Sequence, residues 1–391
     1  MHFFNNRKRR KKIKKIILSL VISISIIGFI LVQRSYSADN PHIRVAVVRD
    51  KDKVSLLVKG PYEIKAIQTD LLLDKDQKLS EREIIPTNTG FKMGDDDFKI
   101  YGMRIIPRTD STIYIDGKSY RGIVDVIRTK NLKLLVVNHI DIEQYLYGVL
   151  YHEMPHYWPY ETLKAQAVAA RTFALYRINV CKEKDFDVTN DIYSQMYGGR
   201  KSERWRSTRA VKATHGEVLT YDGKVLPAYY HSICAGHTED AEQVFDVKLT
   251  PLRGRKDPYC KGARNTAWKA MFSYRQMEDR LTKYGVKVKG FKSIEEGKRD
   301  PSGRLTTVDA KDSSGLIKIP AFKFRLALGP NVIKSTNFKI KVTPAGVVFR
   351  GTGWGHGVGM CQWGAFGMAK RRFNYRKILE FYYPGAKIER Y

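Results

Sequence analysis

Acidic residues are scarce in this sequence of 391 residues: 40 Asp and Glu residues face 70 Lys and Arg residues, and the formal net charge is +30. Such a balance usually indicates a polyanionic partner, most often a nucleic acid. The sequence nevertheless lacks the zinc-finger, helix-turn-helix and RNA-binding signatures that would accompany that role. It also lacks internal repeats and low-complexity tracts, which excludes repeat arrays. We therefore expect no nucleic-acid partner.

Long hydrophobic runs are absent, with one exception near the N-terminus. Residues 16–32 are seventeen consecutive uncharged residues, and residues 7–15 before them carry eight positive charges. As a helix, this run would be about 26 Å long, enough for a thin bilayer. The positive-inside rule places the basic tail in the cytoplasm and the remaining chain outside. We expect residues 1–33 to be a cytoplasmic tail and an uncleaved single-pass anchor in the cell membrane. A cleaved signal peptide is the alternative.

Short β-rich segments followed by longer helical ones predict an α+β fold after the anchor. We expect residues 34–140 to form a β-rich lobe, because turn residues separate β-rich segments at 43–48, 54–58, 112–115 and 132–137. Residues 141–391 are expected to form a mixed catalytic region, with a subdomain inserted at about 265–345 and a groove between the lobes. Within this region the pattern predicts helices over 161–174, 274–284 and 320–328.

One glutamate, Glu153, has the neighbours expected of a catalytic acid. The aromatic residues Tyr151, Tyr157 and Trp158 lie close to it in sequence and would keep water from its carboxyl group. Desolvation disfavours the charged form and raises the pKa, so that the group still holds a proton near neutral pH. An ordinary exposed loop acid is the alternative interpretation.

An alanine-rich segment follows Glu153 and predicts a buried scaffold helix. Pro159 suits the first turn of this helix, and Glu161 suits the positive end of its dipole. The small side chains between residues 165 and 174 let another backbone approach closely. Arg171 would then need a partner within the protein interior, either a carboxylate or the substrate.

Residues 152–156 spell His-Glu-x-x-His, the signature of zinc metalloproteases. That motif functions only when both histidines lie one turn apart on a continuous helix. Pro155 stands between the two histidines, where it removes a backbone donor and pushes Met154 toward an extended conformation. The metalloprotease is therefore the least favoured of the functions considered.

Several motifs together resemble the stage II sporulation protein D family. The resemblance covers residues 43–391 and rests on Glu153-Met154-Pro155, Glu161-x-Leu163-Lys164-Ala165-Gln166-Ala167-x-Ala169-Ala170-Arg171-Thr172-Phe173-Ala174, Gln195-Met196-Tyr197-x-Gly199, His231-Ser232-x-Cys234-x-Gly236-x-Thr238-Glu239, Lys334-Ser335-Thr336-x-Phe338 and Gly353-Trp354-Gly355-His356-Gly357-Val358-Gly359-Met360-Cys361-Gln362-Trp363-Gly364-Ala365. The family usually carries Ser where this chain has Cys361.

The resemblance implies a membrane-anchored lytic transglycosylase that cuts peptide-stripped peptidoglycan glycan strands during engulfment in endospore-forming bacteria. It implies that Glu153 is the catalytic acid and that Arg171, Gln195 and Tyr197 belong to the substrate site. It also implies two partners, a sporulation peptidoglycan amidase and a further membrane protein. A non-catalytic glycan-binding protein that enhances an amidase is the alternative.

The presence of a single prominent carboxylate agrees with a lytic transglycosylase. Glycoside hydrolases normally use two carboxylates, one as acid and one as nucleophile or base. A lytic transglycosylase can work without the second, because the 6-hydroxyl of the sugar attacks the anomeric carbon and gives a 1,6-anhydro end. Glu153 would donate the proton to the glycosidic oxygen and then accept the hydroxyl proton.

The glycine cluster at residues 351–359 lacks the Gly-Lys-Ser/Thr ending of a phosphate-binding loop. Its glycines permit unusual backbone angles and could bring His356, Gln362 and Trp363 to a shared glycan-binding surface. A structural turn leading into a helix near Met360 is the alternative.

The chain contains only four cysteines, and two of them lie near histidines. His231, Cys234, His237 and Cys260 could complete a closed tetrahedral zinc site that supports the fold and takes no part in catalysis. A disulfide between Cys234 and Cys260 is the simpler alternative in an oxidising compartment. A third possibility gives His231 a role in the glycan groove.

Overall fold

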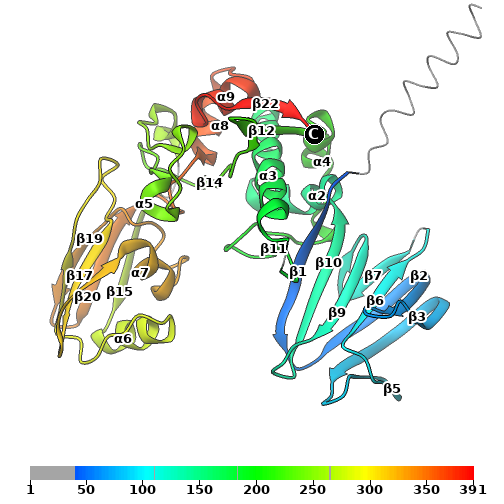
Figure 1. Ribbon diagram of the computed structural model, residues 1–391. Helices are drawn as coiled ribbons and strands as arrows, with labels where there is room; N and C mark the ends of the chain where they lie inside the picture. The colour runs from blue at the N-terminus through cyan, green and yellow to red at the C-terminus, as the bar shows by residue number, and fades with distance from the viewer. Residues whose placement is uncertain (1–39, 110, 183, 264–265) are drawn as a thin grey trace, which may run out of the picture. The chain divides into compact units, whose positions relative to one another are not determined.

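The structure is a computed structural model that describes residues 40–391 except residues 110, 183, 264 and 265. Residues 42–391 form one unit, whose elements are labelled in Figure 1. The expected tail and anchor, residues 1–33, lie outside the described residues. Within the part of the chain that is described, no helix has the length and apolar character needed to cross a membrane. The unit combines sheets and helices, which confirms the predicted α+β class.

Residues 42–141 form most of an 11-stranded sheet that is almost entirely antiparallel. Its strand order is β11-β1-β10-β9-β6-β2-β3-β4-β5, with β7 paired to β2 and β8 paired to β7. The strands are β1 His42–Lys51, β2 Val54–Ala66, β3 Leu72–Pro86, β4 Phe91–Met93, β5 Asp96–Phe98, β6 Gly102–Pro107, β7 Thr112–Ile115, β8 Lys118–Tyr120, β9 Ile123–Arg128, β10 Leu134–Asp141 and β11 Val188–Thr189. Alternate residues of β1, namely Ile43, Val45 and Val47, are buried in the main core, as expected for a strand with one face covered.

Helix α2, Ile142–Glu153, begins directly after β10 and was not predicted from the sequence. Asp141 is its N-cap and accepts a hydrogen bond from the backbone N–H of Gln144 at 2.9 Å. The helix ends at Glu153 because Met154, which precedes a proline, takes an extended conformation with φ of −154°. The buried face of α2 consists mainly of Ile142, Tyr145, Leu146, Val149 and Leu150.

Helix α3, Tyr160–Val180, is the scaffold helix that the alanine-rich segment predicts. It contacts α2, α4 (Trp205–Ala213), β12 (Glu217–Tyr221), α8 (Gln362–Lys370) and α9 (Tyr375–Tyr382). Its small side chains allow this close approach on several sides. The fully buried alanines are Ala165, Ala167, Ala169, Ala170 and Ala174.

Two segments that are about 130 residues apart in sequence meet beside α3. Strand β14 (Tyr230–His231) pairs in parallel with β21 (Met360–Cys361), and α8 begins immediately after β21. This pairing places the start of α8 next to β14. The other elements of this region are η1 Arg200–Ser202, β13 Lys224–Val225, α5 Ala241–Phe245, η2 Thr250–Leu252, η3 Pro258–Gly262 and β22 Lys387–Arg390, where η denotes a 3₁₀ helix.

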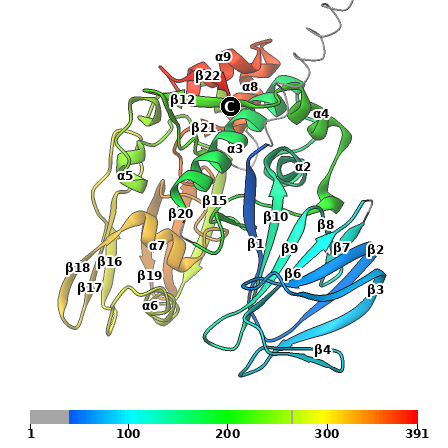
Figure 2. The ribbon, with the colours of Figure 1, turned by 45° about the vertical axis from the view of Figure 1, so that its right-hand side comes forward.

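Two three-stranded sheets and two helices lie between residues 267 and 352 (Figure 2). They share a hydrophobic core of their own. Their order is β15-β20-β19 and β16-β17-β18. The predicted helices 274–284 and 320–328 correspond to α6 and α7. The elements are β15 Ala267–Phe272, α6 Tyr274–Lys283, β16 Ser293–Glu296, β17 Thr307–Asp312, β18 Gly315–Pro320, α7 Ala321–Leu328, β19 Phe338–Thr343 and β20 Gly346–Thr352.

Candidate active site

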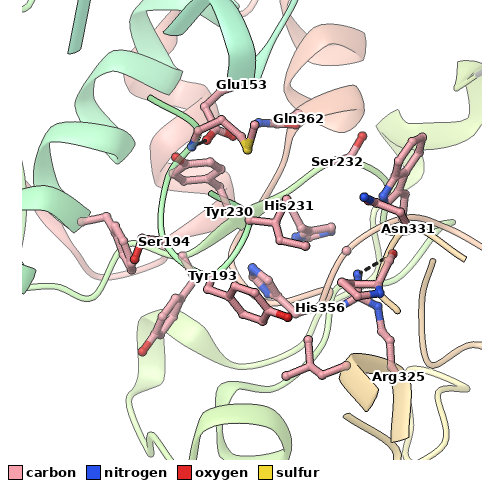
Figure 3. Close-up of a pocket in the computed structure, with 18 of the residues that line it drawn as sticks. Glu153, Tyr193, Ser194, Tyr230, His231, Ser232, Arg325, Asn331, His356 and Gln362 are labelled. Atoms are coloured by element: carbon pink, nitrogen blue, oxygen red, sulfur yellow. Dashed lines mark hydrogen bonds between the residues drawn. The ribbon is translucent and has the colours of Figure 1, made fainter. Parts of the chain in front are cut away.

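Glu153 faces a cavity of about 460 Å³ (Figure 3). The walls come from the end of α2, the loop at residues 192–196, β14, α7 and the glycine-rich segment at residues 354–356. Among the described residues that line this cavity, Glu153 is the only acid. The cavity therefore offers one carboxyl group, surrounded by aromatic rings and neutral polar groups.

Three hydrogen bonds hold the Glu153 carboxyl group. The backbone N–H of Met196 donates to Oε1 at 3.0 Å, and the side chains of Tyr230 and Gln362 also form hydrogen bonds with it. Burial raises the pKa of Glu153 from 4.5 to about 7, although all three hydrogen bonds favour the charged form and lower the pKa. Roughly half of the molecules therefore carry a protonated Glu153 at neutral pH.

The pKa shift has the direction expected from the sequence, but other residues cause it. None of the three aromatic residues expected to shield Glu153, which are Tyr151, Tyr157 and Trp158, lines the cavity. Tyr157 in particular is 72 % exposed. Residues distant in sequence surround the carboxyl group instead, among them Tyr230, which stands directly before the His231 motif.

Gln195, which was expected to bind substrate, lies behind the cavity wall and is fully buried. Its Nε2 donates hydrogen bonds to the Tyr230 hydroxyl at 2.9 Å and to the Ala170 carbonyl at 3.2 Å. Its Oε1 accepts a hydrogen bond from the Tyr145 hydroxyl at 3.1 Å. Gln195 therefore positions Tyr230, which in turn contacts Glu153.

Two histidines face each other in the cavity wall, with ring centroids 5.7 Å apart. His231 Nδ1 lies 3.1 Å from the Val358 carbonyl, and the buried Nε2 has no partner among the described residues. His356 Nδ1 accepts a hydrogen bond from the Val358 N–H at 3.1 Å. Burial lowers the pKa of both, to about 3 for His356, so both are neutral. Gly355, at φ 109°, lets the chain pass over His231, since a Cβ there would lie 2.7 Å from the Cβ of His231.

His356 and Gln362 thus line the cavity as expected, whereas Trp363 does not. The Trp363 ring packs against Trp158, with centroids 5.1 Å apart, and against Phe366. Helical geometry explains the difference, because consecutive residues of α8 point in directions about 100° apart. Trp363 belongs to a small hydrophobic cluster behind the site.

Tyr197 is also absent from the cavity lining, contrary to the expectation of substrate binding. It is 5 % exposed, and its hydroxyl donates to Asn138 Oδ1 at 2.9 Å. Its ring packs beside Gly148 of α2, where a Cβ would lie 2.7 Å from a ring carbon. Tyr197 therefore holds α2 against the main sheet.

Arg171 is fully buried and does not reach the cavity, so the expected direct contact with substrate is not met in this structure. Its Nε and Nη2 donate to the two oxygens of Glu143 at 2.6 and 2.8 Å. Further hydrogen bonds reach the carbonyls of Glu217 at 3.0 Å and Val211 at 3.1 Å. The sequence allowed either a carboxylate or the substrate as the partner of Arg171, and in the structure the partner is a carboxylate. This ion pair joins α3 to α2, the helix that carries Glu153.

The two histidines of the His-Glu-x-x-His segment do not form a metal pair. Helix α2 ends before His156, and His152 Nε2 lies 2.6 Å from Ser202 Oγ. Among the described residues, no group of three or more suitably spaced ligands includes either histidine.

The expected zinc ligands separate into two sets. Cys234 and Cys260 lie close together, but their neighbours are Asp257 and Cys361, with all four ligand atoms within 4.8 Å of one another. His231 lines the cavity instead, and His237 Nδ1 lies 2.7 Å from the Thr238 carbonyl. All four cysteines of the chain are free, so no Cys234–Cys260 disulfide is formed. Cys361 could not be found by local spacing, since the long-range pairing of β14 with β21 brings it here, whereas Asp257 lies only three residues before Cys260.

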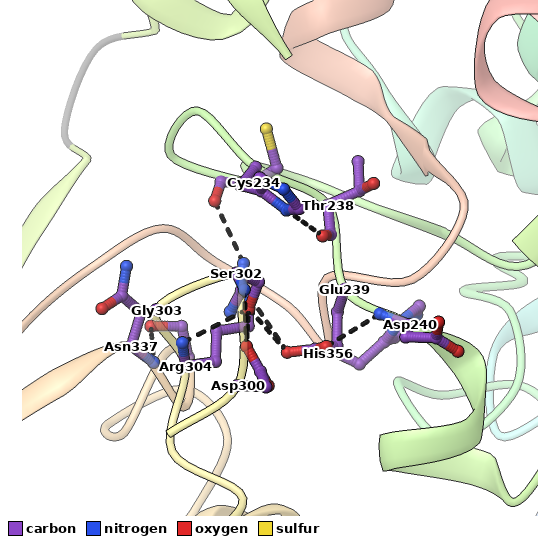
Figure 4. A network of polar contacts seen from close by, with 12 residues as sticks. Cys234, Thr238, Glu239, Asp240, Asp300, Ser302, Gly303, Arg304, Asn337 and His356 are labelled. Atoms are coloured by element: carbon purple, nitrogen blue, oxygen red, sulfur yellow. Dashed lines mark hydrogen bonds and ion pairs between the residues drawn. The ribbon is translucent and has the colours of Figure 1, made fainter. Parts of the chain in front are cut away.

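A buried charged network joins the region at residues 267–352 to the cavity segments (Figure 4). Arg304 Nη2 donates to the Cys234 carbonyl at 3.1 Å, and its Nε lies 3.9 Å from Glu239 Oε2. The same Glu239 oxygen accepts a hydrogen bond from Ser302 Oγ at 2.9 Å. Gly357 passes directly over Arg304, where a Cβ would lie 2.8 Å from Nε. The network therefore fixes the segment that carries the cavity histidines.

Comparison with known proteins agrees with the motifs. The model of the stage II sporulation protein family matches residues 130–221, and that of a domain of unknown function matches residues 246–359. An uncharacterized protein of Brachyspira hyodysenteriae is 36% identical over 89% of this chain and 93% of its own length. The stage II sporulation protein D of Bacillus subtilis is 30% identical over 68% of this chain and 78% of its length.

The amidase enhancer of Bacillus subtilis is 31% identical over 78% of this chain. The match covers 49% of that protein, so the chain spans about half the length of this relative.

Proposed function

Because the chain belongs to the stage II sporulation protein D family, we propose that it is a lytic transglycosylase that cleaves peptide-stripped peptidoglycan strands during sporulation. Residues 16–32 would anchor it in the cell membrane with the catalytic unit outside, where peptidoglycan lies. The observation that carries the proposal is the lone Glu153 carboxyl, held in a cavity with a pKa of about 7.

In the proposed reaction, Glu153 donates its proton to the glycosidic oxygen as the bond to the anomeric carbon breaks. The 6-hydroxyl of the same sugar then attacks that carbon, and the Glu153 carboxylate accepts the hydroxyl proton. The product carries a 1,6-anhydro ring, no water is consumed, and Glu153 is protonated again. No second carboxylate is required, in agreement with a cavity lined by one acid among the described residues.

Tyr230 and Gln362 are suited to hold Glu153 through both steps. Each forms a hydrogen bond with the carboxyl group and favours its charged form, which is the form present between proton donation and proton return. The neutral His231 presents an unpartnered Nε2 that can accept a hydrogen bond from a sugar hydroxyl.

Arg325, on α7, supplies a positive charge for an anionic substrate. Removal of the stem peptide leaves a free lactyl carboxylate on each muramic acid. Arg325 lines the cavity, and its buried Nε has no partner in the part of the chain that the structure describes. Burial lowers its pKa to about 10, so it remains protonated at neutral pH. A buried guanidinium facing a carboxylate gives a strong charge-assisted hydrogen bond.

The decisive experiment compares the wild type with Glu153→Gln on peptide-free glycan strands. Mass spectrometry should detect new 1,6-anhydro ends with the wild type and none with the variant, while both proteins sediment with the strands. A variant that still produces anhydro ends would exclude Glu153 as the acid.

The likeness to an amidase enhancer supports a second candidate, a non-catalytic protein that binds glycan and stimulates an amidase. In that case, neither protein would produce anhydro ends, and Glu153→Gln would stimulate peptide release by a peptidoglycan amidase as well as the wild type does. The same two proteins therefore distinguish the candidates.

A further inference from the structure

Three thiols and one carboxylate converge at a buried point outside the cavity. Cys234 follows β14, Asp257 is the N-cap of η3, Cys260 lies within η3, and Cys361 ends β21. Their ligand atoms all lie within 4.8 Å of one another, with Cys260 Sγ 3.5 Å from Cys361 Sγ and Cys234 Sγ 3.1 Å from Asp257 Oδ2. None of the four lines the cavity that holds Glu153.

We propose that Cys234, Asp257, Cys260 and Cys361 bind one zinc ion in a closed, structural site. Three thiolates and one carboxylate supply four protein ligands, and four ligands complete the tetrahedral coordination of structural zinc. The soft sulfur ligands disfavour magnesium and calcium, which prefer oxygen. All four residues are buried, which leaves no open position for water or substrate.

The dimensions of the group fit one ion. In a tetrahedral site with Zn–S bonds of about 2.3 Å, neighbouring sulfur atoms lie about 3.7 Å apart. The sulfur atoms of Cys260 and Cys361, which are 3.5 Å apart, need only small side-chain movements to reach that spacing. An iron–sulfur cluster would require cysteines much farther apart, because the cluster itself separates its ligands.

Surrounding donors already orient the ligands, as is usual around metal sites. The Tyr382 hydroxyl donates to Asp257 Oδ2 at 2.8 Å. Cys361 Sγ accepts hydrogen bonds from the backbone N–H groups of Cys234 at 3.3 Å and Gly364 at 3.4 Å. Gly364 leaves room for the site, because a Cβ there would lie 2.3 Å from Asp257 Oδ2.

The position of the ion gives it a definite role. Cys361 directly precedes Gln362, and Cys234 lies four residues after Tyr230. A single ion would therefore join the two segments that bring Gln362 and Tyr230 to Glu153, and it would take no part in the chemistry.

Metal and thiol content of the full-length chain test the proposal directly. The protein is purified without chelator or added metal, analysed by elemental mass spectrometry, and then denatured with a chelator and an alkylating reagent. We expect about one zinc per chain and four alkylated cysteines, which are the three ligands and Cys181. Three outcomes would each overturn the proposal. They are four alkylated cysteines without zinc, only two alkylated cysteines, which would indicate a disulfide, and stoichiometric iron or copper in place of zinc.

Matched variants assign the ligands. Cys361→Ser introduces the residue that the family motif usually carries, so the fold should accept it, and we expect the zinc content to fall severalfold. Cys181→Ser alters a buried cysteine outside the group and should keep its zinc. If Cys361→Ser is insoluble, Asp257→Asn should lose zinc to a chromogenic chelator at least tenfold faster than the wild type, and equal rates would contradict the proposal. Glu153→Gln should retain zinc, which separates this test from that of the proposed reaction.

Discussion

Burial of the Glu153 carboxyl makes folding stability depend on pH, and Glu153→Gln isolates that dependence. The pKa of this group rises from 4.5 to about 7 in the folded protein. The folded state therefore binds the proton more tightly than the unfolded chain. The stability that the protonated Glu153 contributes is complete below pH 4.5 and is lost as the pH rises through 7. A shift of about 2.5 units corresponds to roughly 3 kcal/mol, at about 1.36 kcal/mol per unit.

The amide of the variant does not titrate. We therefore expect the free energy of unfolding of Glu153→Gln, relative to that of the wild type, to rise by up to about 3 kcal/mol as the pH is raised from 4.5 to 8. Urea denaturation at both pH values, followed by intrinsic fluorescence, measures this difference. Other titrating groups are common to both proteins and cancel, including Tyr145 and Tyr230, whose burial raises their pKa values further above the tested range.

The control is Glu380→Gln on α9, a glutamate whose side chain is 64% exposed. Its stability relative to the wild type should be nearly the same at both pH values. If Glu153→Gln behaved like this control, the carboxyl group would be solvated, and the argument for a proton-holding acid would fail.

Four further outcomes are expected. First, kcat/KM on peptide-free strands should fall about tenfold from pH 6 to pH 8, as the protonated fraction of Glu153 falls from about 90% to about 10%; a flat profile would contradict the acid role. Second, Tyr230→Phe removes a hydrogen bond worth about 1 kcal/mol to the charged form, so the alkaline limb of that profile should move up by about 0.7 pH units. Third, Arg171→Met leaves the buried Glu143 carboxylate unpaired and should cost about 3–5 kcal/mol in thermal or chemical denaturation, with partial recovery when Glu143→Gln is added; a change below about 1 kcal/mol would show that the pair is not structural. Fourth, Arg325→Met should raise KM severalfold for strands with free lactyl carboxylates, with little change in kcat, and an unchanged KM would remove Arg325 from the site.

Elements with a clear local pattern could be predicted from the sequence. Helices α6 and α7 begin and end within one residue of the predicted bounds, and the alanines of α3 correctly indicated a buried helix. Pro155 correctly predicted that no helix continues between His152 and His156. Helix α2 was missed although its signals were present, namely the Asp141 cap and apolar residues at spacings of three and four.

Contacts between distant segments could not be predicted in the same way. Glu153 was singled out correctly as a carboxyl facing the cavity, but Tyr230 and Gln362, which contact its carboxyl group, reach it only through the fold. Arg171 is a second example, because the family motif marks this residue without indicating whether it contacts substrate or pairs with a carboxylate such as Glu143. Cys361 joins Cys234 through a strand pairing that local spacing does not reveal.

The two-residue pairing of β14 with β21 has a consequence for the order of folding. Helices α2 and α3 are neighbours in sequence, so they can associate early, with little loss of chain entropy. The segment that carries Gln362 must instead close a loop of about 130 residues before it reaches β14. Glu153 would remain hydrated, with an ordinary carboxyl titration, until that late step. Partly folded molecules would thus carry the acid without the raised pKa that the proposed reaction requires.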